Sequence, residues 1–557
     1  MQGLGKRHEP GKDIRPSRHV RPPVMNRLIP APMAKACADS NGERSRMYDK
    51  LRTRWQRRGA ATRSHWAMRL WGMSLGVLVA TGALAQEQRG ASPAPDLDLG
   101  KQVYTRKCAQ CHGDDGKGAG PAAERVFPRP RDFTSGVYKI RTTPSGTIPT
   151  DDDLFRSVTN GLPGTSMPGW SVLPERDRRQ VVQYIKTFSD KFTESPPTPI
   201  TMPAEVPSSS ESLARGKELY RDAECWQCHG DEGRGDGPSL PDLKDDWDHP
   251  IWPANLTKCW NFRGGSTRQD IFRAFMTGLS GTPMPSYADI FEPQQAWDLT
   301  NYVHSLCRDR SVDIFVRAVA TTGELPTDIN DARWASAPAI DFPLVGQIVQ
   351  DPRQFAPSVD AVTVRALHDD REIVLLLSWD DRTQSKVNPE AKIDDDAFVV
   401  QWPARLSEGP EKPYFLYGDT SRPVYLWHWT AGTEGIAESN ATGFGTESPQ
   451  RQESQGLQGT VQYDHGQYRM LVRRTLTTSD KENDLQFEEA KFIPIGFSAW
   501  DGSHGEAGNK RAISAWYFLY LEPTPSRARL LYPGIAVVAI AAAELFFSRQ
   551  GRRRGSA

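Results

Sequence analysis

One segment of the sequence occurs twice, and each copy contains a Cys-x-x-Cys-His motif. The stretch LDLGKQVYTRKCAQCHGDDGKGAGP at 97–121 recurs as LARGKELYRDAECWQCHGDEGRGDGP at 213–238. Further along each copy, DLFRSVTNGLPGTSMPGW at 153–170 recurs as DIFRAFMTGLSGTPMPSY at 270–287. Self-similarity over two separated stretches indicates a tandem duplication of one domain, so both copies must satisfy the same fold.

Each motif predicts one covalently attached haem c. In Cys-x-x-Cys-His both thiols add to the vinyl groups of the porphyrin, and the adjacent imidazole binds the iron. A structural zinc site or a redox dithiol could use the same residue types, but two motifs inside one repeat favour haem. The predicted haem residues are Cys108, Cys111 and His112 in the first copy, and Cys225, Cys228 and His229 in the second.

A methionine at a matched distance from each motif is the expected second iron ligand. Met167 follows His112 by 55 residues, and Met284 follows His229 by the same 55. Methionine more often fills a core, but both of these lie in Gly- and Pro-rich loops. A His/Met pair raises the reduction potential, and iron with six ligands has no open position for a substrate. The two haems are therefore expected to carry electrons.

Two all-α domains are expected over 97–192 and 211–311, joined by a Pro- and Ser-rich linker at 193–210. Each begins with a helix that holds Gly100 or Gly216, and each ends with a helix that carries a tyrosine. A glycine lets an aromatic side chain approach the backbone of a crossing helix closely. This part resembles the class I cytochromes c, which implies a compact helical fold around each haem.

Residues 330–525 have the pattern of an all-β sandwich. Short runs of alternating apolar and aromatic residues are separated by Gly, Pro and Asp, which predicts antiparallel strands. Stretches near 397, at 413–429 and at 497–521 resemble the haem-b-binding gamma subunits of the dimethyl sulfoxide reductase family, such as that of ethylbenzene dehydrogenase, and related parts of nitrite oxidoreductases. The resemblance implies a sandwich that binds haem b between a Met and a Lys and exchanges electrons with a molybdenum subunit.

Of that Met and Lys pair, only the lysine has a counterpart in this sequence. The lysine corresponds to Lys510. Because Arg511 is the next residue, the alignment with the family could also be shifted by one position. Where the family has its methionine, this chain has Tyr417, which could replace it because a tyrosine can bind haem iron. Met470 and His428 are the other candidates. The alternative is a sandwich without haem that serves for docking.

Both ends of the chain suggest export. Residues 1–85 look like a basic leader and a signal peptide with cleavage after Ala85. An apolar stretch at 529–548, followed by arginines, predicts a C-terminal transmembrane helix. Because 1–85 hold 17 of the 69 basic residues and 5 of the 69 acidic ones, the remainder is acidic, which argues against a nucleic-acid partner. The expected location is a bacterial inner membrane, crossed once, with the bulk in the periplasm.

Two cysteines outside the motifs occur in the second copy only. Cys259 and Cys307 could form a disulfide in an oxidising compartment, or remain two separate buried thiols.

These features predict a membrane-anchored electron carrier with two haems c. If the sandwich binds haem, the chain also holds one haem b. We find no catalytic triad, phosphate loop or open metal site, so the chain is not expected to be an enzyme. The expected partners are a molybdenum and iron–sulfur oxidoreductase of the nitrite or nitrate type, and another cytochrome or a terminal oxidase. One alternative is a free-standing respiratory cytochrome. Another is a carbohydrate-binding or sugar-oxidising cytochrome whose sandwich uses Trp427, Trp429 and Trp500.

Overall fold

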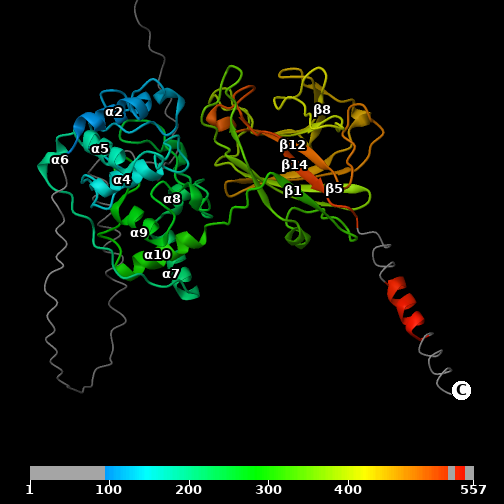
Figure 1. Cartoon of the computed structure of the whole chain (residues 1–557), viewed down its shortest axis with the longest axis horizontal. Helices are drawn as coiled ribbons and strands as arrows, with labels where there is room; N and C mark the ends of the chain where they lie inside the picture. The colour runs from blue at the N-terminus through cyan, green and yellow to red at the C-terminus, as the bar shows by residue number, and fades with distance from the viewer. Residues whose placement is uncertain (1–93, 525–533, 546–557) are drawn as a thin grey trace, which may run out of the picture.

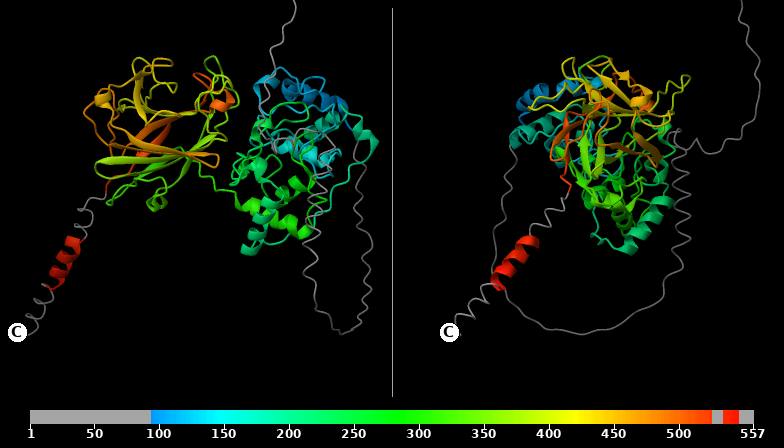
Figure 2. Two further views of the ribbon diagram at one scale, coloured as in Figure 1. Left: turned by 180° about the vertical axis from the view of Figure 1, so that it is seen from behind. Right: turned by 90° about the vertical axis from the view of Figure 1, so that its right-hand side faces the viewer.

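The computed structural model describes residues 94–524 and 534–545, which contain two helical domains followed by a β domain (Figure 1). The first helical domain contains α2 Leu97–Lys107, α3 Ala109–His112, α4 Asp151–Asn160, α5 Glu175–Lys186 and α6 Lys191–Glu194. The second contains α7 Ser210–Asp222, α8 Trp226–His229, α9 Arg268–Thr277 and α10 Pro293–Ser305. The helical domains lie together on one side of the β domain (Figure 2).

The two helical domains are built around the same pair of crossing helices. A Cβ on Gly100 of α2 would lie 2.4 Å from the carbonyl oxygen of Gln180 on α5. A Cβ on Gly216 of α7 would lie 2.1 Å from the carbonyl oxygen of Asp298 on α10. Only glycine allows backbones to approach this closely. The expected crossing of the first and last helix of each repeat is thus present in both copies.

The β domain holds fourteen strands in the described part of the chain. They are β1 Phe315–Ala320, β2 Ile340–Pro343, β3 Val345–Gly346, β4 Ala361–His368, β5 Glu372–Asp380, β6 Ala397–Pro403, β7 Val424–Thr430, β8 Ala437–Ala441, β9 Ser448–Pro449, β10 Gln458–Asp464, β11 Gln467–Thr475, β12 Phe492–Trp500, β13 Ala512–Ile513 and β14 Tyr517–Leu521. The main order is β10-β11-β5-β4-β1-β14-β12-β6-β7-β8-β9. In addition, β2 pairs with β4, and β13 pairs with β12 and β3.

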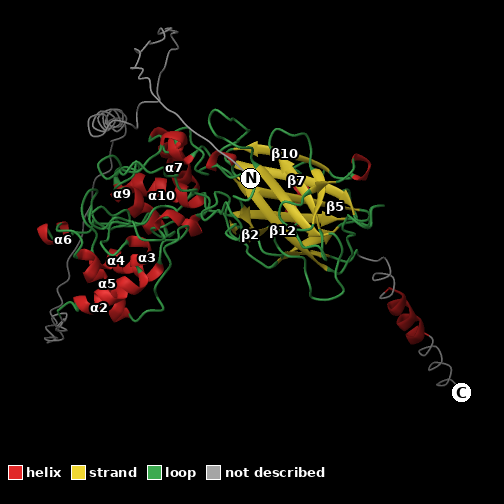
Figure 3. Cartoon of the chain, turned by 90° about the horizontal axis from the view of Figure 1, so that it is seen from above, coloured by secondary structure: helices red, strands yellow, loops and turns green. Residues whose placement is uncertain are grey.

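The long sheet forms two layers that meet at β12, with a hydrophobic core between them. One half of β12 pairs with β14 and the other half with β6. Trp379 on β5 stacks on Phe398 of β6 with ring centroids 4.2 Å apart, so residues from the two halves face each other. Figure 3 shows the strands gathered in this domain, apart from the helices. The predicted sandwich is therefore present.

The strand directions differ from the prediction at one place. β1 lies between β4 and β14 and is parallel to both, so the sandwich is mixed and not wholly antiparallel. β1 also begins at Phe315, ahead of the expected range 330–525. Its partners come from far along the chain, and the alternation of apolar residues carries no information on strand direction. The sequence pattern could not indicate this arrangement.

The predicted C-terminal transmembrane helix at 529–548 is not supported. Among the described residues no helix is long and apolar enough to cross a membrane. The predicted leader and signal peptide at 1–85 lie outside the described residues.

Candidate haem sites

The two Cys-x-x-Cys-His motifs have the same local fold. In each, the last four motif residues form a one-turn helix, α3 or α8, that follows the long first helix within three residues. The Tyr104 hydroxyl donates to the carbonyl of Gly113 at 2.7 Å, and the Tyr220 hydroxyl donates to that of Gly230 at 2.6 Å. These bonds tie the end of each motif to the preceding helix. None of the four motif cysteines forms a disulfide, so no disulfide competes with the predicted thioether bonds.

Both motif histidines are held in one orientation by the backbone. Nδ1 of His112 lies 3.0 Å from the carbonyl oxygen of Arg131, and Nδ1 of His229 lies 2.9 Å from that of Ala254. A carbonyl only accepts, so Nδ1 carries the hydrogen and Nε2 keeps its lone pair. Burial lowers the pKa of both imidazoles, which favours the neutral form that binds iron.

The two methionine loops also share one hydrogen-bond pattern. In the first, the backbone N–H of Met167 donates to the Thr165 hydroxyl at 3.1 Å, and the Met167 carbonyl accepts from Leu162. In the second, the Met284 N–H donates to the Thr282 hydroxyl at 3.2 Å, and the Met284 carbonyl accepts from Leu279. The two repeated loops thus present their methionines from the same backbone geometry.

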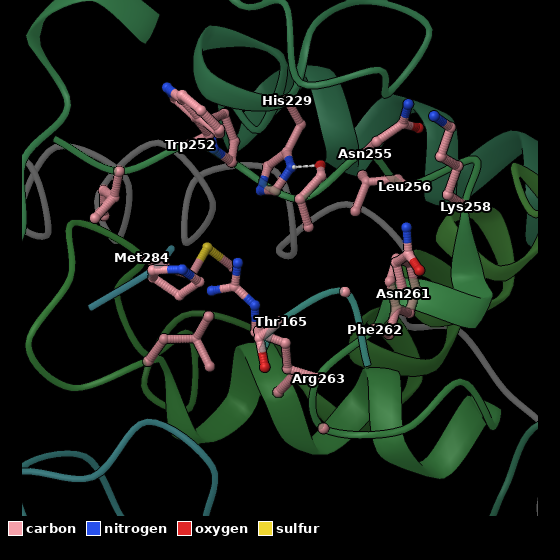
Figure 4. A pocket seen from close by; sticks show the side chains of 18 of the residues that line it. Thr165, His229, Trp252, Asn255, Leu256, Lys258, Asn261, Phe262, Arg263 and Met284 are labelled. Carbon is pink, nitrogen blue, oxygen red and sulfur yellow. Dashed lines mark hydrogen bonds between the residues drawn. The ribbon is translucent and has the colours of Figure 1, made fainter. Parts of the chain in front are cut away.

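The structure brings the predicted residues of the second haem site together around a cavity of about 770 Å³. The His229 ring and the Met284 sulfur both project into it, and Cys225 and Cys228 are in its lining (Figure 4). Apolar side chains such as Leu256 complete much of the wall. The size and the mostly apolar lining are those of a site for a large cofactor.

All three domains contribute to the wall of this cavity, which the sequence did not indicate. Thr165 comes from the first helical domain and Asp360 from the β domain. The Arg141 guanidinium also spans the boundary between the helical domains, because it donates to the carbonyl of Thr277 at 2.6 Å. The second haem site therefore lies where the three domains meet.

The cations that line the same cavity without an acidic partner include one from each domain. These three are Lys139, Arg263 and Arg382, and none of them forms an ion pair within 4.0 Å in the described part of the chain. Burial and the neighbouring Arg131 and Arg263 lower the pKa of Lys139 to about 8. Burial and Arg382 lower the pKa of Arg263. Such crowded positive charge suits the propionates of a haem.

A buried ion-pair network joins the second helical domain to the β domain beside this cavity. The Lys258 ammonium, 6% exposed, lies 2.6 Å from Asp360 and 2.8 Å from Asp380. Burial alone would raise the pKa of Asp380, but Lys258 outweighs it and holds that pKa at about 2. No motif marks these residues, because their pairing depends on how two domains pack.

Cys259 and Cys307 form a disulfide, with Cα atoms 5.5 Å apart. This settles the alternative that the sequence left open. The bond connects the segment that carries Lys258 to the end of the second helical domain, directly ahead of the β domain.

The candidate haem b ligands in the β domain are not arranged as an iron-binding pair. The Tyr417 hydroxyl accepts from Arg511 at 2.8 Å, and the Arg511 guanidinium packs over the rings of Tyr417, Phe444 and Trp500. Burial raises the pKa of Tyr417, which opposes the phenolate that would bind iron. Arg511 thus takes the place that a metal would need, and these residues do not fit haem b.

The other candidates lie elsewhere. Met470 is fully buried on β11, where it pairs with Leu377 of β5. The His428 ring is engaged with the Thr430 hydroxyl at 3.0 Å. Lys510 lies on the loop before β13, next to Arg511 but without its contacts to Tyr417.

The tryptophans proposed for sugar stacking belong to the interior. Trp427 is fully buried and packs on Trp402, while Trp429 and Trp500 are each 8% exposed. Rings enclosed in this way cannot stack on a carbohydrate at the surface. These tryptophans therefore do not support the carbohydrate-binding alternative.

The fold and the two sites define a class of electron-transfer protein with covalently bound haem. Comparison with protein families gives three matches, each to one domain. Residues 213–307 match the family described as cytochrome c, and residues 95–185 match cytochrome c oxidase, cbb3-type, subunit III. Residues 331–461 match the ethylbenzene dehydrogenase family.

Similar proteins include electron-transfer subunits of reductases. A protein described as a respiratory nitrate reductase haem subunit of Haloferax mediterranei is 27% identical over 39% of this chain and 80% of its own length. The chlorate reductase subunit gamma of Ideonella dechloratans is 26% identical over 37% of this chain and 83% of its own length. Cytochrome c 2.1 of Caenorhabditis elegans is 31% identical over 18% of this chain and 95% of its own length. The chain belongs to the cytochrome c family, with an ethylbenzene dehydrogenase-like domain fused behind its haem domains.

Proposed function

We propose that this chain carries electrons through two covalently bound haems, as a subunit of or close partner to a molybdenum oxidoreductase of the nitrate or chlorate reductase type. The main support comes from His112 and His229. In both, Nδ1 donates to a backbone carbonyl, so Nε2 can bind iron. The bound haems supply one-electron redox chemistry. The names of the reductase haem subunits similar to this chain support the class of partner.

Met167 and Met284 are the proposed sixth ligands. Their loops share one backbone geometry, and the Met284 sulfur projects into the cavity that also receives the His229 ring. Iron held from both sides has no position for a substrate, so the chain acts as an electron-transfer subunit and its partner performs the catalysis.

The second haem is the proposed junction of the electron path. Its cavity has walls from all three domains, so this haem lies between the first helical domain and the β domain. The β domain then serves to dock the partner, and no electron step is assigned to a haem b within it, because Tyr417 is occupied by Arg511.

We place the folded domains on the periplasmic side of the membrane. The Cys259–Cys307 disulfide supports this location, because such bonds persist in oxidising compartments and are rare in the cytosol.

Isolation of the chain from its native source tests the choice of partner. A complex that contains molybdenum and iron–sulfur clusters, and that reduces or oxidises the haems when its substrate is added, is the expected result. A chain that is isolated alone, and whose haems respond to no such enzyme, contradicts the proposal.

A cbb3-type oxidase is the second candidate partner, because residues 95–185 match subunit III of that enzyme. The reduced chain would then support oxygen consumption by a purified oxidase of this type. Nitrate- or chlorate-dependent oxidation of the haems, without oxidase, would favour the reductase instead.

A pyridine haemochrome spectrum tests the cofactor content. We expect two haems c per chain and no extractable haem b. Extractable haem that is lost in Tyr417→Phe would show that the Arg511–Tyr417 contact opens to bind iron.

A further inference from the structure

Three aspartates that the haem sites do not use meet at one end of the β domain. Asp381 directly follows β5, Asp396 directly precedes β6, and Asp501 directly follows β12. One carboxylate oxygen from each lies within 4.8 Å of the other two. The three residues are only 1%, 1% and 3% exposed. Three strand ends therefore bring three acids into one enclosed space.

No cation of the described chain is paired with these carboxylates. The nearby Lys258 pairs with Asp360 and Asp380, and the Arg382 guanidinium lies over the Trp252 ring. Within the described residues, no ion pair includes Asp381, Asp396 or Asp501. Buried carboxylates at this separation repel one another strongly unless a positive charge lies between them.

One oxygen in this group has no partner at all. The Asp381 Oδ1 accepts from the backbone N–H of Thr383 at 3.1 Å, but its Oδ2 is buried and has no hydrogen bond. A buried polar atom without a partner costs about 1–3 kcal/mol, and more when it is charged. The Asp381 Oδ2 is thus the oxygen of the group that a bound cation would stabilise most.

The other two carboxylates are held firmly in place. Asp396 accepts from the Tyr468 hydroxyl at 2.7 Å and from the Gly502 N–H at 2.9 Å. Asp501 accepts from the Ser503 hydroxyl at 2.6 Å. These bonds fix the direction of the oxygens before any ion arrives, and they add hydroxyl oxygen close to the group.

We propose that Asp381, Asp396 and Asp501 bind one hard divalent cation of the Ca²⁺ type. Every ligand atom in the group is an oxygen, and carboxylate oxygens favour Ca²⁺, while nitrogen and sulfur ligands favour Zn²⁺ or copper. One ion would satisfy the free oxygen of Asp381 and remove the repulsion among the three acids.

The site lies where the β domain contacts the second helical domain. Asp380 and Arg382, on either side of Asp381, both line the second haem cavity. The short helix Gly502–His504 follows Asp501, and the His504 ring lies 4.6 Å from that of Trp252 in the second helical domain. The bound ion would therefore hold the loops that form part of the haem cavity wall.

The test uses the full chain with both haems attached, treated with EGTA and a chelating resin. Isothermal titration with CaCl₂ should then show one site, and elemental analysis after dialysis should give one calcium for every two haem irons. Added CaCl₂ should also raise the first thermal unfolding temperature. No calcium bound at pH 7.5, and no change in unfolding temperature, would overturn the proposal.

Asp381→Asn is the most informative variant, because it keeps the bond to Thr383 and removes the charge of the free oxygen. We expect its affinity for Ca²⁺ to fall at least about tenfold. Asp394→Asn, two residues from Asp396 and outside the group of three, should bind as the wild type does. Equal affinity in Asp381→Asn and the wild type would contradict the assignment.

The competing occupant is a proton, since burial and the neighbouring Asp501 and Asp396 raise the pKa of Asp381 well above its usual range. A group held together by a proton would bind no calcium at pH 7.5, so the same titration rejects the cation. The haem spectra of each variant show whether it has folded, and the wild-type titration decides the question even where a variant does not fold.

Discussion

At the scale of single residues, the methionine ligands give a direct prediction. Met284→His should lower the reduction potential of one haem by on the order of 100 mV, because imidazole favours ferric iron more than a thioether does. Met167→His should do the same to the other haem. Spectroelectrochemical titration resolves the two steps, and an unchanged potential in either variant means that the ligand was wrongly chosen.

The unpaired cations that line the second cavity should affect the reduction potential of the second haem, and Arg263 tests this. Positive charge near a haem disfavours the ferric state, so Arg263→Gln should lower the potential of the second haem by on the order of tens of millivolts. Arg353→Gln is the control, because Arg353 is paired with Asp351 and does not line the cavity. A potential that does not move would show that the Arg263 guanidinium is distant from the haem.

At the scale of elements, the crossing of α7 and α10 depends on Gly216. Gly216→Ala would place a methyl group 2.1 Å from the carbonyl oxygen of Asp298, and this oxygen belongs to a helix backbone that cannot move aside easily. We expect a loss of about 1–3 kcal/mol in stability, with less of the second haem attached.

Calorimetry and the haem content per chain measure this effect. Gly409→Ala is the matched control, because nothing lies within 4 Å of a Cβ there. Equal stability of the two variants would mean that α7 and α10 are not as close as the structure places them.

The same elements show what sequence can and cannot indicate. Gly100 and Gly216 recur at matching positions of a repeat, so the crossing helices could be predicted. The roles of the motif residues and of the two methionines as haem ligands stay predictions. Strand β1 could not be placed, because the choice of parallel neighbours is made by segments far along the chain. Arg511 over Tyr417 was equally hidden, since only packing shows that the hydroxyl is already engaged.

At the scale of the whole molecule, the position of the second haem site follows from domain packing. Its wall takes residues from three domains, and no single repeat contains the information for it. The contact between the second helical domain and the β domain rests in part on Lys258 and its two acids. The haem environment and the docking of the β domain are therefore linked through one buried network.

Lys258→Met tests that link. The change leaves the Asp380 side chain, which is 10% exposed, with only Arg234 at 3.7 Å, so we expect a loss of about 3 kcal/mol near pH 7. Because the folded-state pKa of Asp380 lies at about 2, below its unfolded value, its stabilising contribution is complete above about pH 4 and is lost as the pH falls toward 2. The difference between wild type and variant should therefore shrink in acid.

Scanning calorimetry at pH 7 and pH 3 measures this difference in the first unfolding transition. Lys244→Met is the control, because Lys244 and Asp248 form an exposed pair, and such pairs contribute little. A loss in Lys258→Met that is the same at both pH values would show that the charge of the two acids does not hold the domains together. A loss that is large at pH 7 and small at pH 3, with a shifted potential of the second haem, would tie the docking of the β domain to the haem itself.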